Sequence, residues 1–172
     1  ERHGRGGFIC AKEDISPQND RDKGAEAQAN AFASQLLLPS YLFDPMVAGL
    51  PLTLDTADKI GKEFQASLTA TAIKLVSCSE RPAVVVCHSQ SKREWFVTGA
   101  RFPEGIWAVT ELDPETDAFE LLYSSAAKGK TTIRQEPGSR WLSGRGAREA
   151  TVRTQSVKVV EGVVVSLIAL ER

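Results

Sequence analysis

Glu26 and Asn30 are the residues whose types and spacing best fit chemistry. They stand four positions apart in the stretch GAEAQANAFASQLLLP, residues 24–39. On a helix of ~3.6 residues per turn they share one side, within an otherwise apolar stripe. A carboxylate on such a stripe needs a neutralising partner, and a bound cation is one. Glu26 is therefore a candidate metal ligand. The alternative is an ordinary carboxylate near a helix N-terminus, which the helix dipole favours by ~0.3 to 1 kcal/mol.

The stretch that carries these two residues is predicted to be a helix. Ala, Gln and Leu dominate it, and no β-branched residue interrupts it. Gly24 and Pro39 mark its two ends. The predicted helix would hold the carboxylate and the amide in fixed positions one turn apart.

A longer pattern in this stretch resembles a known family. The pattern is E-x-x-x-N followed by x-F-A-x-x-L-L-x-P, formed by Glu26, Asn30, Phe32, Ala33, Leu36, Leu37 and Pro39. It is similar to the third-ligand helix of the ImmA/IrrE family of zinc metallo-endopeptidases. In that family an earlier helix carries H-E-x-x-H, whose two histidines bind zinc and whose Glu is the general base. The resemblance implies that Glu26 is the third protein ligand and that Asn30 orients it.

The chain departs from the family at the metal site. It contains no H-E-x-x-H, and His3 and His88 are its two histidines. The chain begins at Glu1 without a methionine, and the family's motif lies a few tens of residues before the third-ligand helix. We therefore expect the chain to be the C-terminal portion of such a protein. Zinc is expected in the complete protein, and neither bound zinc nor peptidase activity is expected of this chain alone.

The two histidines have ordinary structural interpretations. His3 lies in the loop-like segment 1–23 and is expected to be a solvent-exposed side chain. His88 ends an apolar run and is expected to be a surface or hydrogen-bonded residue, rather than a metal ligand.

Composition limits the classes of function. The formal net charge of -1 gives no reason to expect a general nucleic-acid or membrane binder. The longest apolar run, residues 163–170, is less than half of the ~20 residues that span a bilayer. The cysteines, Cys10, Cys78 and Cys87, form no C-x-x-C pair, so reduced thiols and a cytoplasmic location are expected.

Helical patterns continue to about residue 77. Apolar residues recur at helical spacing from about Asp55 to Gln65, with Thr53 or Asp55 as the cap, and Ser67 caps a third helix. Two short helices joined by a tight turn resemble a helix-turn-helix unit. Lys74 is the one basic residue between Leu68 and Cys78, so packing is favoured over DNA recognition.

Strand patterns dominate after about residue 82. Residues 83–87 and 95–98 predict a hairpin around the polar turn 89–92, and residues 151–160 and 163–170 predict another around Glu161-Gly162. Residues 163–170 are apolar on both faces, which predicts a central strand covered on both sides. Residues 118–124 fit a strand or a short helix, and residues 128–138 are expected to be exposed.

These patterns predict an α+β fold. The first domain, residues 1–80, would be helical and would form the rear part of a zincin-like peptidase domain with helix-turn-helix-like helices. The second, residues 81–172, would be a mixed α+β domain. It is expected to be GAF-like, by analogy with family members that carry such a domain at this place.

Basic residues gather in the second half. Five arginines fall within twenty residues: Arg134, Arg140, Arg145, Arg148 and Arg153. Of these, Arg140, Arg145 and Arg148 are candidate ligands for a phosphate or a carboxylate. The alternative is a solvated charged face, which is the usual role of such runs.

Two functional hypotheses follow. By the resemblance, the complete protein is a zinc-dependent metallopeptidase that acts on a regulatory protein, in the family typically a helix-turn-helix repressor. The alternative is a non-enzymatic regulatory module that senses a small molecule or binds a protein. It predicts an apolar pocket between the 163–170 strand and the side chains of Trp95, Trp107 and Trp141.

Overall fold

The computed structural model describes residues 32–125 and 129–171. Contacts divide the chain into two units, Glu1–Leu36 and Leu37–Arg172. Residues 32–37 are helical, which confirms that part of the helix predicted over residues 24–39. Glu26, Asn30 and His3 lie outside the described residues.

Three helices open the larger unit: α2 (Ser40–Val47), α3 (Leu54–Phe64) and α4 (Leu68–Ser77). Thr53 Oγ1 accepts a hydrogen bond from the backbone N–H of Thr56, and Ser67 Oγ accepts one from that of Ala70. Side-chain oxygens at these positions satisfy N–H groups that have no partner inside the helix. The predicted starts of both helices are therefore confirmed.

The sequence did not predict α2. Pro45 lies inside it, and a proline in a helix interior removes one backbone donor. The helix forms nonetheless, because it buries Phe43 against α3, where the Phe43 and Phe64 ring centroids are 5.8 Å apart. Tertiary packing here outweighs local propensity.

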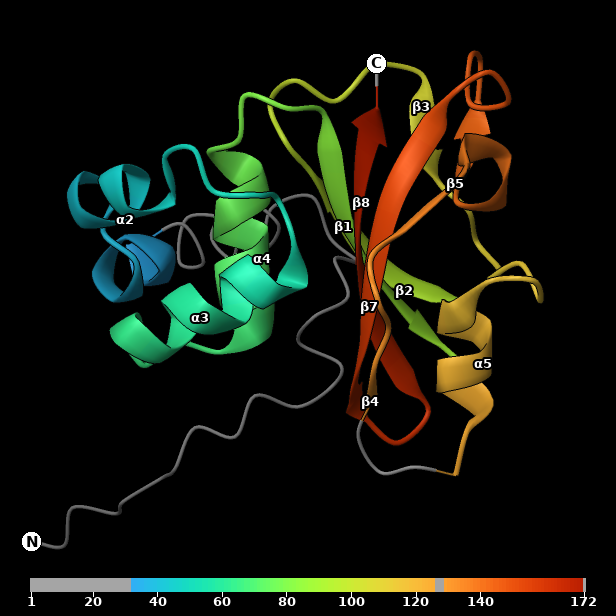
Figure 1. The fold of residues 1–172 in the computed structure, drawn as a ribbon, viewed down its shortest axis with the longest axis horizontal. Helices are drawn as coiled ribbons and strands as arrows, with labels where there is room; N and C mark the ends of the chain where they lie inside the picture. The colour runs from blue at the N-terminus through green and yellow to red at the C-terminus, as the bar shows by residue number, and fades with distance from the viewer. Residues whose placement is uncertain (1–31, 126–128, 172) are drawn as a thin grey trace, which may run out of the picture. The chain divides into compact units, whose positions relative to one another are not determined.

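One antiparallel sheet of six strands of different lengths forms the centre of this unit (Figure 1). Its strands run in the order β2-β1-β8-β7-β4, and β5 also pairs with β7. They are β1 (Ala83–Ser89), β2 (Arg93–Thr98), β4 (Gly129–Lys130), β5 (Arg134–Pro137), β7 (Thr151–Val160) and β8 (Val163–Glu171). Both predicted hairpins are confirmed, β1 with β2 and β7 with β8.

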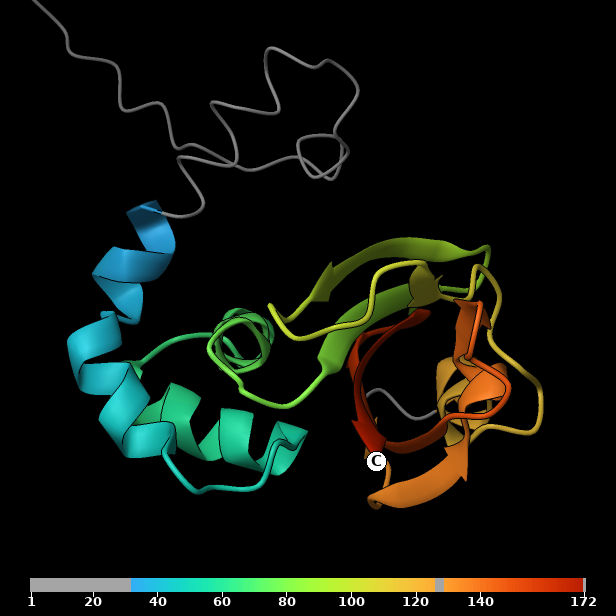
Figure 2. The ribbon, with the colours of Figure 1, turned by 90° about the horizontal axis from the view of Figure 1, so that it is seen from above.

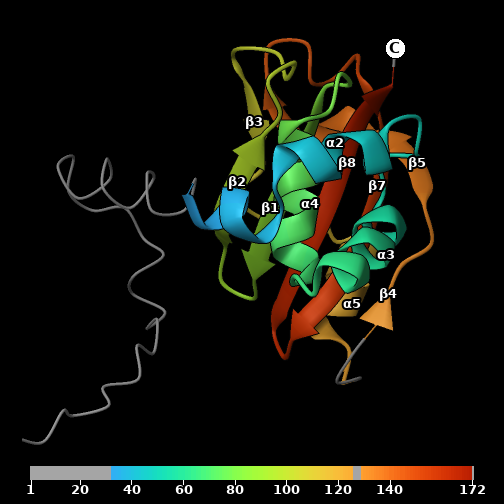
Figure 3. The same ribbon diagram turned by 90° about the vertical axis from the view of Figure 1, so that its left-hand side faces the viewer.

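The central position predicted for the last strand is confirmed. β8 lies between β1 and β7, and six of its nine residues are buried. Alternate side chains of a strand point to opposite faces, so burial of a continuous run requires a covering layer on each side. Figures 2 and 3 show these layers, with α3 and α4 over one face and α5 on the other.

Each face of the sheet has its own apolar core. On the helical face, α2, α3 and α4 pack against Ala83, Val85 and Cys87 of β1 and against Val165, Leu167 and Ala169 of β8. On the opposite face, Val84, Val86, Val164 and Ile168 meet a second layer that includes Ala118, Leu122, Trp141 and Leu142. The two cores bury the alternate residues of the same two strands.

The second layer is built from short elements. They are β3 (Ile106–Ala108) paired with β6 (Leu142–Gly144), the helix α5 (Asp117–Tyr123), and the 3-10 turn η2 (Gly138–Arg140). The structure resolves the open choice for residues 118–124 as a helix. Thr116 Oγ1 caps that helix by accepting from the N–H of Phe119.

The larger unit is thus an α+β fold in which helices α2–α4 share a core with the sheet. Among the described helices, none is both long and apolar enough to cross a membrane.

Candidate functional site

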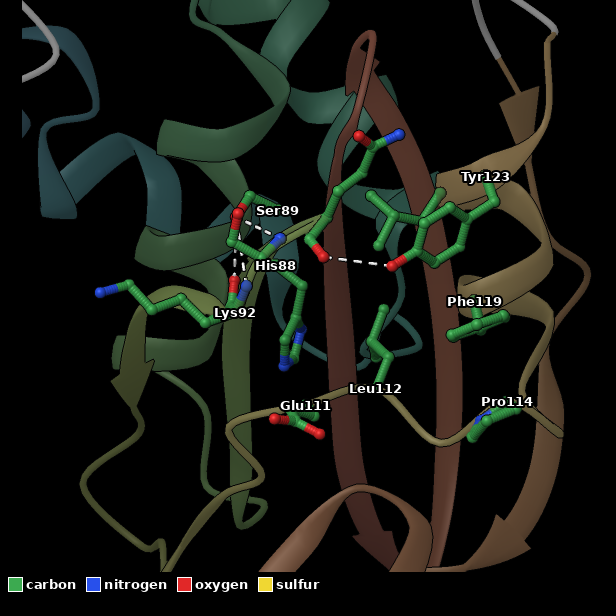
Figure 4. Close-up of a pocket in the computed structure, with 11 residues that line it drawn as sticks. His88, Ser89, Lys92, Glu111, Leu112, Pro114, Phe119 and Tyr123 are labelled. Carbon is green, nitrogen blue, oxygen red and sulfur yellow. Dashed lines mark hydrogen bonds between the residues drawn. The ribbon is translucent and has the colours of Figure 1, made fainter.

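A pocket of about 370 Å³ opens where the β1–β2 turn meets α5 (Figure 4). A volume of this size lies within the range of small-molecule sites. One wall is polar and the other is apolar. The lining residues are His88, Ser89, Gln90, Ser91, Lys92, Glu111, Leu112, Pro114, Phe119, Leu122 and Tyr123.

Backbone and side-chain hydrogen bonds hold the polar wall in place. The N–H of Ser89 donates to the carbonyl of Lys92 (2.9 Å), which closes the tight turn between β1 and β2. Ser89 Oγ accepts from the N–H groups of Ser91 (3.3 Å) and Lys92 (3.4 Å). The turn that carries this wall is therefore fixed at its base by three bonds.

The apolar wall comes from α5 and the loop before it. The ring centroids of Phe119 and Tyr123 are 4.6 Å apart with planes tilted by 46°, a favourable aromatic arrangement. Tyr123 Oη donates to the carbonyl of Gln90 (3.1 Å), which ties α5 to the β1–β2 turn. Leu112 and Leu122 complete this wall and are buried.

His88 is the buried polar residue of the pocket, with 1% of its surface exposed. The prediction of a surface position is wrong, and that of a hydrogen-bonded one is confirmed. Its Nε2 is 3.1 Å from the carbonyl oxygen of Val109. Its Nδ1 has no hydrogen-bond partner among the described residues.

The protonation of His88 follows from these contacts. A carbonyl oxygen only accepts, so Nε2 carries the hydrogen and Nδ1 presents a lone pair. Burial lowers the pKa of His88 and the charge of Arg93 lowers it further, while the bond to Val109 opposes both. The neutral imidazole is thus the form favoured at neutral pH, with a bare acceptor at Nδ1.

The structure does not bring the three tryptophans together. Trp95 packs against the core on the helical face, whereas Trp141 is buried in the core on the opposite face. Trp107 has 49% of its surface exposed. The predicted tryptophan-lined pocket is therefore wrong. Trp95 pairs with Cys87, which points to the helical face, and strand alternation separates it from Trp141.

The candidate anion-binding arginines have different surroundings. Arg140 is paired with Glu115, and its Nη1 is 3.8 Å from Glu136 Oε1. Arg145 and Arg148 are exposed, and neither forms an ion pair within the described part of the chain. An anion at Arg140 would compete with two carboxylates already in place, so anion binding by these three residues stays a prediction.

Glu136 occupies a position that the sequence did not indicate. It lies in the segment 128–138, which was expected to be exposed, yet it is 8% exposed. Its Oε2 accepts from Trp141 Nε1 (2.7 Å) and from Thr154 Oγ1 (2.7 Å). The segment forms β5 against β7, and the strand turns every second residue inward.

The side chains of the described residues give little support for a metal site. In residues 32–125 and 129–171, no group of three or more His, Cys, Asp or Glu side chains could hold a metal ion. The candidate ligand Glu26 and its support Asn30 lie outside these ranges, so their roles stay predictions.

Comparisons with known proteins leave the family open. No family model matches the chain, and no curated protein matches it.

The sequence pointed to His88 only as the end of an apolar strand. Its half-satisfied imidazole results from the carbonyl of Val109, which is distant in sequence. One signal was available: the apolar run 83–87 ends at a histidine, and a polar group that continues a buried strand needs partners.

Proposed function

We propose that the α+β unit, residues 37–171, is a small-molecule-binding regulatory domain of a larger protein. The observation that carries this proposal is the pocket at His88, where a buried acceptor without a partner faces an apolar wall. Small-molecule sites are concave and combine apolar walls with placed polar groups, and here six of the eleven lining residues are polar. We propose that the domain is GAF-like.

The layered architecture supports a sensing role. The sheet is covered by α2–α4 on one face and by loops, β3, β6 and α5 on the other. The pocket lies on the second of these faces. A ligand there would contact the β1–β2 turn and α5 at once, and Tyr123 joins these two segments by its hydrogen bond to Gln90.

We further propose that the complete protein is an ImmA/IrrE-like zinc metallopeptidase acting on a repressor-type protein. The support is the pattern from Glu26 to Pro39. Zinc in such an enzyme would activate a water for attack on a peptide carbonyl. The described residues provide no ligand set, so no peptidase step is assigned to this chain.

The outer face of α2 favours this second proposal. Large apolar side chains are exposed there and next to it: Tyr41 at 78%, Leu42 at 47%, Met46 at 42% and Leu50 at 41%. Three of these residues lie on α2, and large apolar side chains exposed on one short helix are suited to contact with another protein. A packed peptidase domain would cover such a face.

The proposed partners follow from charge and burial. Lys74, the basic residue of α4, is buried and donates to Ser40 Oγ (2.7 Å), so it is not available to phosphates. We therefore propose protein and small-molecule partners rather than nucleic acid. The free thiols of Cys78 and Cys87 fit a cytoplasmic protein.

Methyl NMR of the full chain with a small-molecule fragment library tests the sensor proposal. Binding should move the methyl resonances of Leu112 and Leu122, which line the pocket. Leu52 and Leu75 belong to the other core and serve as internal controls. A library that moved all four leucines equally, or none of them, would remove the support for a ligand site here.

Two observations test the peptidase proposal. A reading frame encoding H-E-x-x-H immediately upstream of Glu1 would support it, and its absence would count against it. Purified chain should contain no stoichiometric zinc. Bound zinc that disappears in Glu26→Ala would reveal a second set of ligands and contradict the expected inactivity of the chain.

A further inference from the structure

We propose that the pocket binds a compact, planar molecule that donates hydrogen bonds and is neutral or positively charged, such as an aromatic amidine. This inference rests on the proposed sensor function and names the ligand class of the same pocket. Three features of the lining carry it: the acceptor of His88, the distribution of charge, and the aromatic wall.

The first feature is the free lone pair of His88. Nε2 donates to the carbonyl of Val109, so Nδ1 remains an acceptor, and it is buried without a partner among the described residues. A buried acceptor that has no hydrogen-bond partner is unfavourable. A ligand N–H or O–H placed at Nδ1 would supply that partner, whereas a ligand acceptor would not.

The second feature is the charge of the lining. Glu111 presents a carboxylate below the His88 ring, and the ammonium of Lys92 points away from the pocket (Figure 4). Lys92 is the one lysine or arginine in the lining. Among the lining residues, an anionic ligand would therefore meet Glu111 without a facing cation, which favours a cationic ligand. Arg93, whose charge also reaches His88, lies outside the lining and donates to the carbonyl of Ala108.

The third feature is the shape of the apolar wall. Phe119 and Tyr123 present ring surfaces from successive turns of α5, and Leu112 and Leu122 complete the wall. Flat ligands pack well on such rings. A cation near the face of an aromatic ring is also attracted to it.

Three probes of equal size and different charge test the ligand class on the full chain. Benzamidine is a cation with four N–H donors, benzamide is a neutral donor, and benzoate is an anion without donors. Titration is followed by the methyl resonances of Leu112 and Leu122 and by the Nδ1 resonance of ¹⁵N-histidine. Benzamidine should move both, benzamide should move both at higher concentration, and benzoate should move neither.

Substitutions assign the effect to named groups. Glu111→Gln keeps the shape of an exposed side chain and should weaken benzamidine about three-fold to ten-fold, with benzamide unchanged. Glu104→Gln, at an exposed site outside the lining, is the matched control and should change nothing. His88→Phe should weaken both donors, because a phenyl ring has no acceptor at the position of Nδ1.

The outcomes separate this inference from the proposed function. If benzoate moved Leu112 and Leu122 as strongly as benzamidine, the ligand class would be wrong, while ligand binding at the pocket would stand. If none of the three probes moved these leucines but other fragments did, the ligand class would again be wrong and the sensor proposal would stand. If no fragment of any charge moved them, both would fall.

Discussion

Gln155 of β7 and Asp55 of α3 are joined by a hydrogen bond of 2.8 Å from Gln155 Nε2 to Asp55 Oδ2. Gln155 Oε1 also accepts from the backbone N–H groups of Leu54 (2.8 Å) and Asp55 (3.2 Å). One amide therefore satisfies two free donors at the start of α3 and connects the helical layer to the sheet. Residues one hundred positions apart are fixed in register by this contact.

Gln155→Leu should lower the free energy of unfolding by about 2–4 kcal/mol, because it leaves the backbone N–H groups of Leu54 and Asp55 without this acceptor. Urea denaturation of the full chain measures the change in the free energy of unfolding. Asp58→Asn, on the exposed side of the same helix, removes an ion pair with Lys62 and is the control, with a change below about 0.5 kcal/mol. Equal losses in both variants would contradict the role of Gln155.

Glu136→Leu should destabilise the chain by about 2–4 kcal/mol, since Trp141 Nε1 and Thr154 Oγ1 both lose their acceptor inside the core. Urea denaturation followed by tryptophan fluorescence measures the change in the free energy of unfolding. Glu115→Gln is the matched control: Glu115 pairs with Arg140 at the surface, so its loss should cost less than about 1 kcal/mol.

The stability of the chain should depend on His88 in acid. Burial lowers the pKa of His88 below its ordinary value of 6.5, so between the two values the unfolded chain binds the proton more readily. The contribution of His88 is present above pH 6.5 and is lost as the pH falls through the lowered pKa. His88→Gln should flatten the difference in unfolding free energy between pH 7 and pH 5, relative to the unmodified chain. Arg93, whose charge acts on His88, and Glu111, which lines the same pocket, are left unchanged in both proteins of this comparison.

Cys87 should be unreactive in the folded chain. Burial, and secondarily Glu94, raises the pKa of its thiol to about 11, so about 1% of it is thiolate at pH 9. A Cys10→Ser, Cys78→Ser variant isolates this thiol, and an aromatic disulfide reagent measures its rate. Reaction should accelerate at least ten-fold in 6 M urea. The raised pKa also means that stability is retained below pH 9 and lost as the pH rises through 11.

Gly144 and Gly105 offer a matched pair of glycines. Gly144 has φ +110°, and a Cβ there would overlap the carbonyl oxygen of Gly105. Gly105 also has positive φ, +76°, but a Cβ there meets nothing within 4 Å. Gly144→Ala should cost about 2–4 kcal/mol and Gly105→Ala about 1 kcal/mol. Thermal unfolding compares them, and equal shifts would contradict the close approach of β3 and β6.

Much of the fold was predictable from local patterns. Thr53 and Ser67 mark helix starts, the pair Glu161-Gly162 marks a turn, and a run apolar on both faces predicts a central strand. These signals depend on residues close in sequence. Propensity and periodicity are therefore sufficient to place these elements.

The site was not predictable in the same way. His88 gains its bond from Val109, and Glu136 gains its donors from Trp141 and Thr154. These contacts form between segments that only the folded sheet brings together. The α2 helix was missed for a similar reason, since its stability depends on burying Phe43.

The location of β8 constrains how the polypeptide is made. This strand follows every other described strand in the chain, yet it stands between β1 and β7. Until it leaves the ribosome, the hairpin β1–β2 and the strand β7 have no common neighbour, and both cores lack a wall. A nascent chain would therefore leave the edges of β1 and β7 that pair with β8 open until β8 inserts.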